Sequence, residues 1–157
     1  MYTLENLPDK KKLRKVTLAL IIEKDRILLA MKKRGFGAGV WNGYGGKQLP
    51  GESIMATAKR ETEEEIGIKV KEIEKIGTIS FFFDEMPQDK DWNQQVTLFR
   101  IKKWQGKPRE SEEMKPKWFH INKIPFELSN YARCCHKPRT HFADVPGTAM
   151  APVCLSS

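Results

Sequence analysis

The sequence contains no apolar run that approaches the length of a membrane-spanning helix, and its first residues, MYTLENLPDKKKLRK, include no apolar block that could serve as a signal peptide. Cysteine is scarce, because the chain has three, at Cys134, Cys135 and Cys154. An odd number of cysteines without an export signal does not indicate a disulfide framework. We therefore expect a cytoplasmic protein with no membrane attachment.

Positive charge is abundant, since 28 lysines and arginines against 20 acidic residues give a net charge of +8. This excess favours an anionic partner, which could be nucleic acid, lipid headgroups or a phosphorylated small molecule, although a solvated surface would also explain it. The acidic residues gather at 61–65, whereas 11–15 and 32–34 are basic. This separation favours a phosphorylated small molecule bridged by a metal ion. No nucleic-acid-binding motif is present, so we expect no stable nucleic-acid partner, and we expect a monomer.

Hydrophobic periodicity predicts one domain with a helix and several strands. Runs of β-branched and aliphatic residues place the strands at 14–22, 27–33, 72–83, 93–104 and 115–121. A helix is expected at 53–66, between a serine that can cap it and a glycine that ends it. The segment 34–47 holds six glycines and should be a loop with close backbone approaches. This order predicts a mixed sheet with helical cover, an α/β or α+β fold.

One face of the predicted helix is acidic. Glu61, Glu64 and Glu65 fall within about 100° of arc, since residues three and four apart share a face. Like charges this close repel, so the face is either a solvated surface or a site for a cation. Several carboxylates at the edge of a buried face suit Mg²⁺ or Mn²⁺, which leave coordination positions for water and phosphate.

The neighbouring arc of this helix is more apolar and should dock on the sheet. It contains Met55, Ala58 and Ile66, together with Thr62. A threonine in an apolar position must find a hydrogen bond, for which the carbonyl four residues back is the nearest acceptor. Glu63 lies on the opposite arc and should point to solvent.

The acidic residues belong to a longer pattern with fixed spacing. Its members are Gly46, Glu52, Arg60, Glu61, Glu64, Glu65, Gly67 and Ile68. This pattern resembles the signature of the Nudix hydrolase superfamily. The preceding MKKRGFGAGVWNGYGGK and the later ESEEMKPKWFHINKIPF are similar to the eukaryotic-type MutT homologues of that superfamily, the oxidised purine nucleoside triphosphatases. The resemblance implies the Nudix fold, an α/β/α sandwich around a mixed β-sheet, with 1–126 as the domain and 127–157 as an atypical, irregular tail.

The resemblance also implies an activity. Nudix enzymes of this type hydrolyse purine nucleoside triphosphates such as 8-oxo-dGTP to the monophosphate and pyrophosphate, with Mg²⁺ or Mn²⁺, and so clear damaged nucleotides from the pool. Divalent ions neutralise the phosphate charge and activate the attacking water. By resemblance, the metal ligands are the carbonyl of Gly45 and the carboxylates of Glu61, Glu64, Glu65 and Glu113. Arg60 and Glu52 resemble the pair that braces the glycine loop against the helix.

Five residues match the substrate-binding positions of these relatives. Lys32 corresponds to a lysine that faces phosphate, and Asn42, Phe36, Phe81 and Phe83 correspond to residues of the base pocket. Each has a structural alternative: a solvated strand end for the lysine, a turn for the asparagine, and core packing for the strand aromatics.

The resemblance fails after Phe126. The relatives carry a tryptophan and then two aspartates that sandwich and hydrogen-bond the purine, whereas this chain has ELSNYARCC. A pocket without these groups should lose discrimination between bases. A hydrolase of another nucleoside diphosphate derivative (a dinucleoside polyphosphate, a nucleotide sugar or capped RNA) or a non-catalytic nucleotide-binding domain therefore remains as an alternative.

Overall fold

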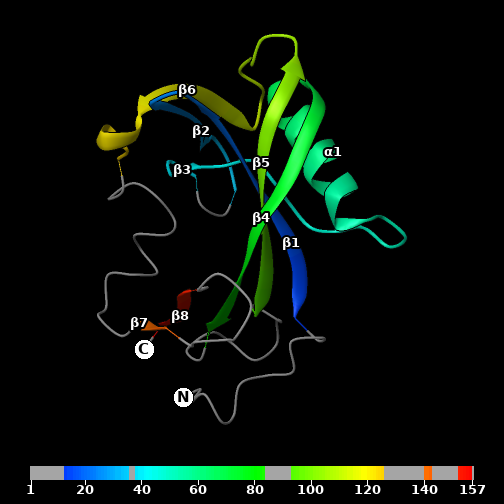
Figure 1. Ribbon diagram of the computed structural model, residues 1–157, viewed down its shortest axis with the longest axis vertical. Helices are drawn as coiled ribbons and strands as arrows, with labels where there is room; N and C mark the ends of the chain where they lie inside the picture. The colour runs from blue at the N-terminus through cyan, green and yellow to red at the C-terminus, as the bar shows by residue number, and fades with distance from the viewer. Residues whose placement is uncertain (1–12, 36–37, 84–92, 126–139, 143–151, 157) are drawn as a thin grey trace.

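The computed structural model describes residues 13–35, 38–83, 93–125, 140–142 and 152–156, which form one sheet with one α-helix packed against it (Figure 1). The strands are β1 (Arg14–Glu23), β2 (Arg26–Lys32), β3 (Trp41–Asn42), β4 (Lys69–Phe83), β5 (Gln94–Gln105), β6 (Met114–His120), β7 (Thr140–Phe142) and β8 (Pro152–Ser156). The helix is α1 (Ile54–Ile66), and a short 3-10 turn follows β6 at Ile121–Lys123. Within this part of the chain, no helix is both long and apolar enough to cross a membrane.

The sheet mixes parallel and antiparallel pairs, as predicted. β1 runs parallel to β5, from Arg14 beside Gln94 to Ile21 beside Ile101. A parallel pair needs a long crossover connection, which α1 and β4 help to supply. β2 is antiparallel to β1, β3 and β6, and β4 is antiparallel to β5. The three longest strands, β1, β4 and β5, are adjacent in the sheet, and α1 covers one of its faces (Figure 1).

The glycine-rich segment is tied to the sheet through the close backbone approaches that its glycines predicted. It contains β3 and forms isolated bridges to β1, where Ala19 lies opposite Tyr44 and Val16 lies opposite Lys47. A Cβ atom on Gly43 would stand 2.7 Å from the carbonyl oxygen of Ala19. Glycine therefore allows a backbone approach to β1 that any other residue would prevent.

The ends of α1 follow the sequence prediction. Ser53 caps the first turn, and its Oγ accepts a hydrogen bond from Ala56 N at 3.1 Å. Gly67 ends the helix in the left-handed conformation, with φ of 69°, and its N–H donates to the carbonyl of Glu63. These two signals fix where the acidic residues of α1 stand relative to the sheet.

The face of α1 that contacts the sheet is partly as predicted. Ala58 and Ile66 are buried, and the buried Thr62 donates its hydroxyl to the carbonyl of Ala58 at 2.7 Å. Met55, which was expected to dock, is 42% exposed, whereas Ile54 packs against the core. A helix turns by about 100° per residue, so this exchange rotates the first turn relative to the predicted face.

Glu63 does not point to solvent, which corrects the second expectation for this helix. Its side chain is 23% exposed and accepts hydrogen bonds from Val70 N and from Lys69 Nζ, each at 2.9 Å. Because the chain reverses at Gly67, the first residues of β4 return past this side chain. Glu63 thus fastens α1 to β4.

Two strands lie within the C-terminal tail. β8 is parallel to β4, with Phe81 beside Cys154, and β7 is antiparallel to β8. The other residues of 127–157 lie outside the described residues, so the boundary at residue 126 remains a prediction.

Candidate active site

Arg60 lies at the centre of the acidic cluster on α1. Its Nε and Nη2 contact the two carboxylate oxygens of Glu52 at 2.9 and 3.1 Å, which is a bidentate pair. Its Nη1 contacts Glu61 at 2.8 Å and Glu64 at 3.2 Å. The side chain of Arg60 is 27% exposed, and those of Glu52 and Glu61 are 16% and 20% exposed. One guanidinium thus holds three carboxylates in place.

Among these carboxylates, Glu52 accepts the most hydrogen bonds that stabilise its charged form. The hydrogen bond from Arg60 lowers its pKa from 4.5 to about 2, and bonds from Thr57 Oγ1 and Leu49 N act in the same direction. The Thr57 hydroxyl is 2.8 Å away, and Thr57 itself is fully buried. Glu52 therefore joins the loop at 47–52 to the first turns of α1.

Glu61 lies directly against the glycine segment. A Cβ atom on Gly46 would stand 2.5 and 2.6 Å from the two carboxylate oxygens of Glu61, closer than real Cβ contacts allow. Thr17 N donates to the Gly46 carbonyl at 2.9 Å and so anchors this part of the segment on β1. The missing side chain of Gly46 is therefore what lets the carboxylate approach the backbone.

Glu65 differs from Glu52 because no lysine or arginine among the described residues forms an ion pair with it. Its Oε2 accepts a hydrogen bond from Gly45 N at 3.1 Å. The pKa of Glu65 is raised from 4.5 to about 8, mainly by burial and also by the charges of Glu61 and Glu113, whereas the hydrogen bond from Gly45 N and the charge of Lys32 oppose the rise. The charged groups Glu61, Lys32 and Glu113 therefore lie within electrostatic reach of Glu65.

Tyr44 was not expected to contribute to the site. It is fully buried, and among the described residues its hydroxyl has no hydrogen-bond partner. Burial raises its pKa, and the charge of Glu65 adds to that effect. Within the part of the chain that the structure describes, the site thus combines a buried hydroxyl that lacks a hydrogen-bond partner with a nearby carboxylate that forms no ion pair. Glycines flank this tyrosine on both sides, so the sequence pattern indicated only a loop residue at this position.

Glu113 and Glu64 lie at the rim of the cluster. The Glu64 side chain is 61% exposed and contacts Arg60, and Glu113 is 56% exposed and accepts from Arg34 Nη2 at 2.9 Å. Among the described residues, no three acidic, histidine or cysteine side chains stand close enough to share an ion. The chemistry of the donors nevertheless fits a hard divalent cation, since the half-buried Glu65 carboxylate lies within electrostatic reach of Glu61 and Glu113 and forms no ion pair within the described part of the chain.

The residues predicted to bind substrate lie in three different surroundings. Lys32 is half-buried at the end of β2, and Asn42 uses its Oδ1 to accept from Gly43 N at 2.9 Å, as a turn residue would. Phe81 is 7% exposed and packs with Leu18 and Val96. Phe36 lies outside the described residues, as does the Phe83 side chain.

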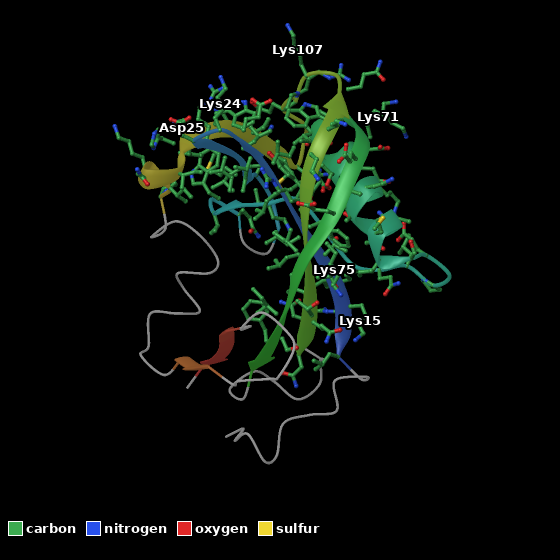
Figure 2. All side chains as sticks on the ribbon, in the orientation of Figure 1. Lys15, Lys24, Asp25, Lys71, Lys75 and Lys107 are labelled. Carbon is green, nitrogen blue, oxygen red and sulfur yellow. The ribbon has the colours of Figure 1, made fainter. Side chains whose placement is uncertain are left out.

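The excess positive charge is spread over the surface. Lys24, Lys71, Lys75 and Lys107 are exposed, and their side chains extend outward in Figure 2, with Lys24 and Lys15 at opposite ends of β1. Separate lysines of this kind fit a solvated surface.

Three comparisons relate this chain to known proteins. The NUDIX domain profile matches residues 12–135. The oxidized purine nucleoside triphosphate hydrolase of Danio rerio is 50% identical over 111 residues, which cover 71% of this chain and 69% of that protein. The protein of the same description from Mus musculus is 50% identical over 110 residues, or 70% of this chain and 68% of that one. Among solved structures, the MutT NUDIX hydrolase from Burkholderia pseudomallei matches with a TM-score of 0.65 and 26% identity, over 78% of this chain and 94% of that chain.

Proposed function

The chain belongs to the NUDIX domain family, and on that premise we propose that it hydrolyses oxidised purine nucleoside triphosphates, such as 8-oxo-dGTP, to the monophosphate and pyrophosphate. The predicted Nudix fold is confirmed by the match to MutT structures. Two relatives described as oxidized purine nucleoside triphosphate hydrolases share half of their aligned residues with it. The same activity was implied by the resemblance of the sequence to the eukaryotic-type MutT homologues.

The observation that carries this proposal is the packing of the acidic face of α1 against the glycine segment. Glu61 lies against Gly46, and Glu65 accepts from Gly45 N, so two carboxylates meet one strip of backbone. Arg60 and Glu52 lock the loop and the helix together around them. A rigid arrangement of this kind supports phosphate chemistry, because reacting groups must be held to within a fraction of an ångström.

In the proposed reaction, water attacks a phosphorus atom and pyrophosphate leaves. Glu61, Glu64, Glu65, Glu113 and the Gly45 carbonyl would hold Mg²⁺, with Mn²⁺ as a substitute. When bound, the ion neutralises phosphate charge and activates water. A carboxylate of the cluster accepts the proton of that water. Lys32 adds positive charge beside Glu65, where it can face the phosphates.

Recognition of the base is assigned to Asn42, Phe36, Phe81 and Phe83. The sequence after Phe126 lacks the tryptophan and the aspartate pair of the relatives, so purine selectivity must come from other groups or be weaker. This departure favours, as the second candidate, a Nudix hydrolase of another nucleoside diphosphate derivative. We further propose that the protein acts as a cytoplasmic monomer on small nucleotides.

A pyrophosphate-release assay with Mg²⁺ tests the proposal. It compares 8-oxo-dGTP, 2-hydroxy-dATP, dGTP and a dinucleoside polyphosphate, with Glu61→Gln as the inactive variant. Glu72→Gln is the matched control, because Glu72 forms exposed ion pairs with Lys102 and Lys103 on the sheet. Preference for the oxidised purines, lost in Glu61→Gln and kept in the control, is expected. Turnover of the dinucleoside polyphosphate alone would replace the proposal with the second candidate.

A further inference from the structure

The loop that carries Glu113 is fastened to the end of β2 by two basic residues. Lys33 N donates to the Glu113 carbonyl at 2.8 Å, and Lys33 Nζ contacts Glu110 Oε1 and the Ser111 carbonyl, each at 2.9 Å. Arg34 Nη2 contacts Glu113 Oε1 at 2.9 Å. Lys33 thus holds the backbone of the loop, whereas Arg34 holds the carboxylate.

The backbone of Glu113 is fixed from its own side as well. Ser111 N donates to the Met114 carbonyl at 2.9 Å, and Ser111 Oγ accepts from Met114 N at 3.0 Å and from Glu113 N at 3.3 Å. Met114 begins β6 and pairs with Lys32 on β2. The position of the Glu113 Cα atom is therefore set, and only its side chain can choose between partners.

Two partners compete for that side chain. Met114, the residue after Glu113, is buried in the same cluster as Tyr44 and Ala58 and so brings Glu113 to the side of α1, yet the Glu113 carboxylate points to Arg34. Both members of the pair are largely exposed, Arg34 by 60% and Glu113 by 56%. Exposed ion pairs contribute little to stability, so a divalent cation can displace the arginine at little cost.

We propose that Arg34 is a positioning residue that holds the Glu113 carboxylate away from the metal site. When a divalent cation binds, Arg34 releases the carboxylate to it. This inference rests on the metal site of the proposed function. It assigns to Arg34 a role opposite to that of Arg60, because Arg60 keeps its bidentate partner while Arg34 exchanges its own. Metal affinity then depends on how strongly Arg34 competes for Glu113.

Mn²⁺ titration of the metal-free protein, followed by electron paramagnetic resonance and without substrate, tests this competition. Arg34→Met should raise Mn²⁺ affinity about two- to five-fold, as the loss of a weak exposed pair predicts. Arg34→Lys, which keeps a charged donor, should restore most of the wild-type affinity. Arg26→Met is the matched control, since Arg26 lies at the other end of β2 and pairs with Glu23.

A double-mutant cycle separates competition from the general effect of removing a positive charge. In a Glu113→Gln background, Arg34→Met should leave Mn²⁺ affinity unchanged. An equal rise in both backgrounds, a fall in affinity, or no change in either would overturn the proposal. Because no substrate is present, the cycle can succeed even if nucleotide hydrolysis fails, and the two claims are judged separately.

Discussion

Glu52 and Glu65 are carboxylates of one acidic site in opposite electrostatic states. Glu52, at the start of α1, is held by Arg60, and its pKa is lowered to about 2. Glu65, near the end of α1, is half-buried beside Gly45, forms no ion pair with any described residue, and has a pKa raised to about 8. The charge of Glu52 is balanced by Arg60, whereas no positively charged side chain among the described residues forms an ion pair with Glu65. We therefore propose that the first region, around Glu52, serves as scaffold and that the second, around Glu65, holds the metal ion at which the reaction takes place.

The largest expected effect follows from Glu65→Gln. Hydrolysis of 8-oxo-dGTP should fall about 100-fold or more, because a metal-binding or proton-accepting carboxylate is lost. The metal-free protein should become more stable, since a buried uncompensated acid is replaced by a neutral amide. Steady-state kinetics and thermal unfolding in EDTA measure the two effects. Loss of both activity and stability would mean that Glu65 is structural.

Arg60→Met should cause the next largest effect, because it removes the brace of the scaffold region. Activity should fall about 10- to 100-fold, as for other residues that orient metal ligands, and the Tm should fall as well. Lys59→Met, on the neighbouring position of α1, is the control and should change neither strongly. Full activity in Arg60→Met would contradict the assignment of Arg60 to the scaffold.

Tyr44→Phe tests the buried hydroxyl of Tyr44, which lies in the same region as Glu65. Its hydroxyl has no partner among the described residues, so removing it should raise the free energy of unfolding of the metal-free protein by about 1 kcal/mol. Thr62→Val is the matched control, because its buried hydroxyl does have an acceptor and its removal should bring no such gain. Denaturant unfolding in EDTA measures both. A destabilised Tyr44→Phe would show that the hydroxyl is bonded.

The smallest effect concerns acid stability. The folded pKa of Glu52, about 2, lies below the ordinary value of 4.5, so its stabilising contribution is complete above pH 4.5 and is lost as the pH falls toward 2. Glu52→Gln should therefore flatten the loss of stability over this window. Denaturant unfolding at a series of pH values measures the slope, and an unchanged slope would argue against the ion pair with Arg60.

The sequence predicted most of this architecture because its strongest signals are local. Ser53 and Gly67 bound α1 through capping, and spacing by three and four residues put Glu61 and Glu65 on one face. The attachment of the glycine segment to β1 depends on contacts between distant residues, such as Tyr44 with Ala19, which no local pattern encodes. The pairing of Arg34 with Glu113 likewise joins positions 79 residues apart.

The errors on α1 have the same origin. Met55 was assigned to the docked face from helical periodicity alone, but the first turn of α1 also has to place Thr57 against Glu52. Glu63 was assigned to solvent because the return of β4 past the helix could not be read from the pattern of α1. Tertiary contacts decided both positions.

The central claim is that the carboxylates of α1 and the glycine segment form a divalent metal site, and crystals soaked in Mn²⁺ test it most directly. The account predicts an anomalous difference peak in contact with the carboxylates of Glu61 and Glu65 beside Gly45. A peak elsewhere, or none at a Mn²⁺ concentration that supports turnover, would contradict it.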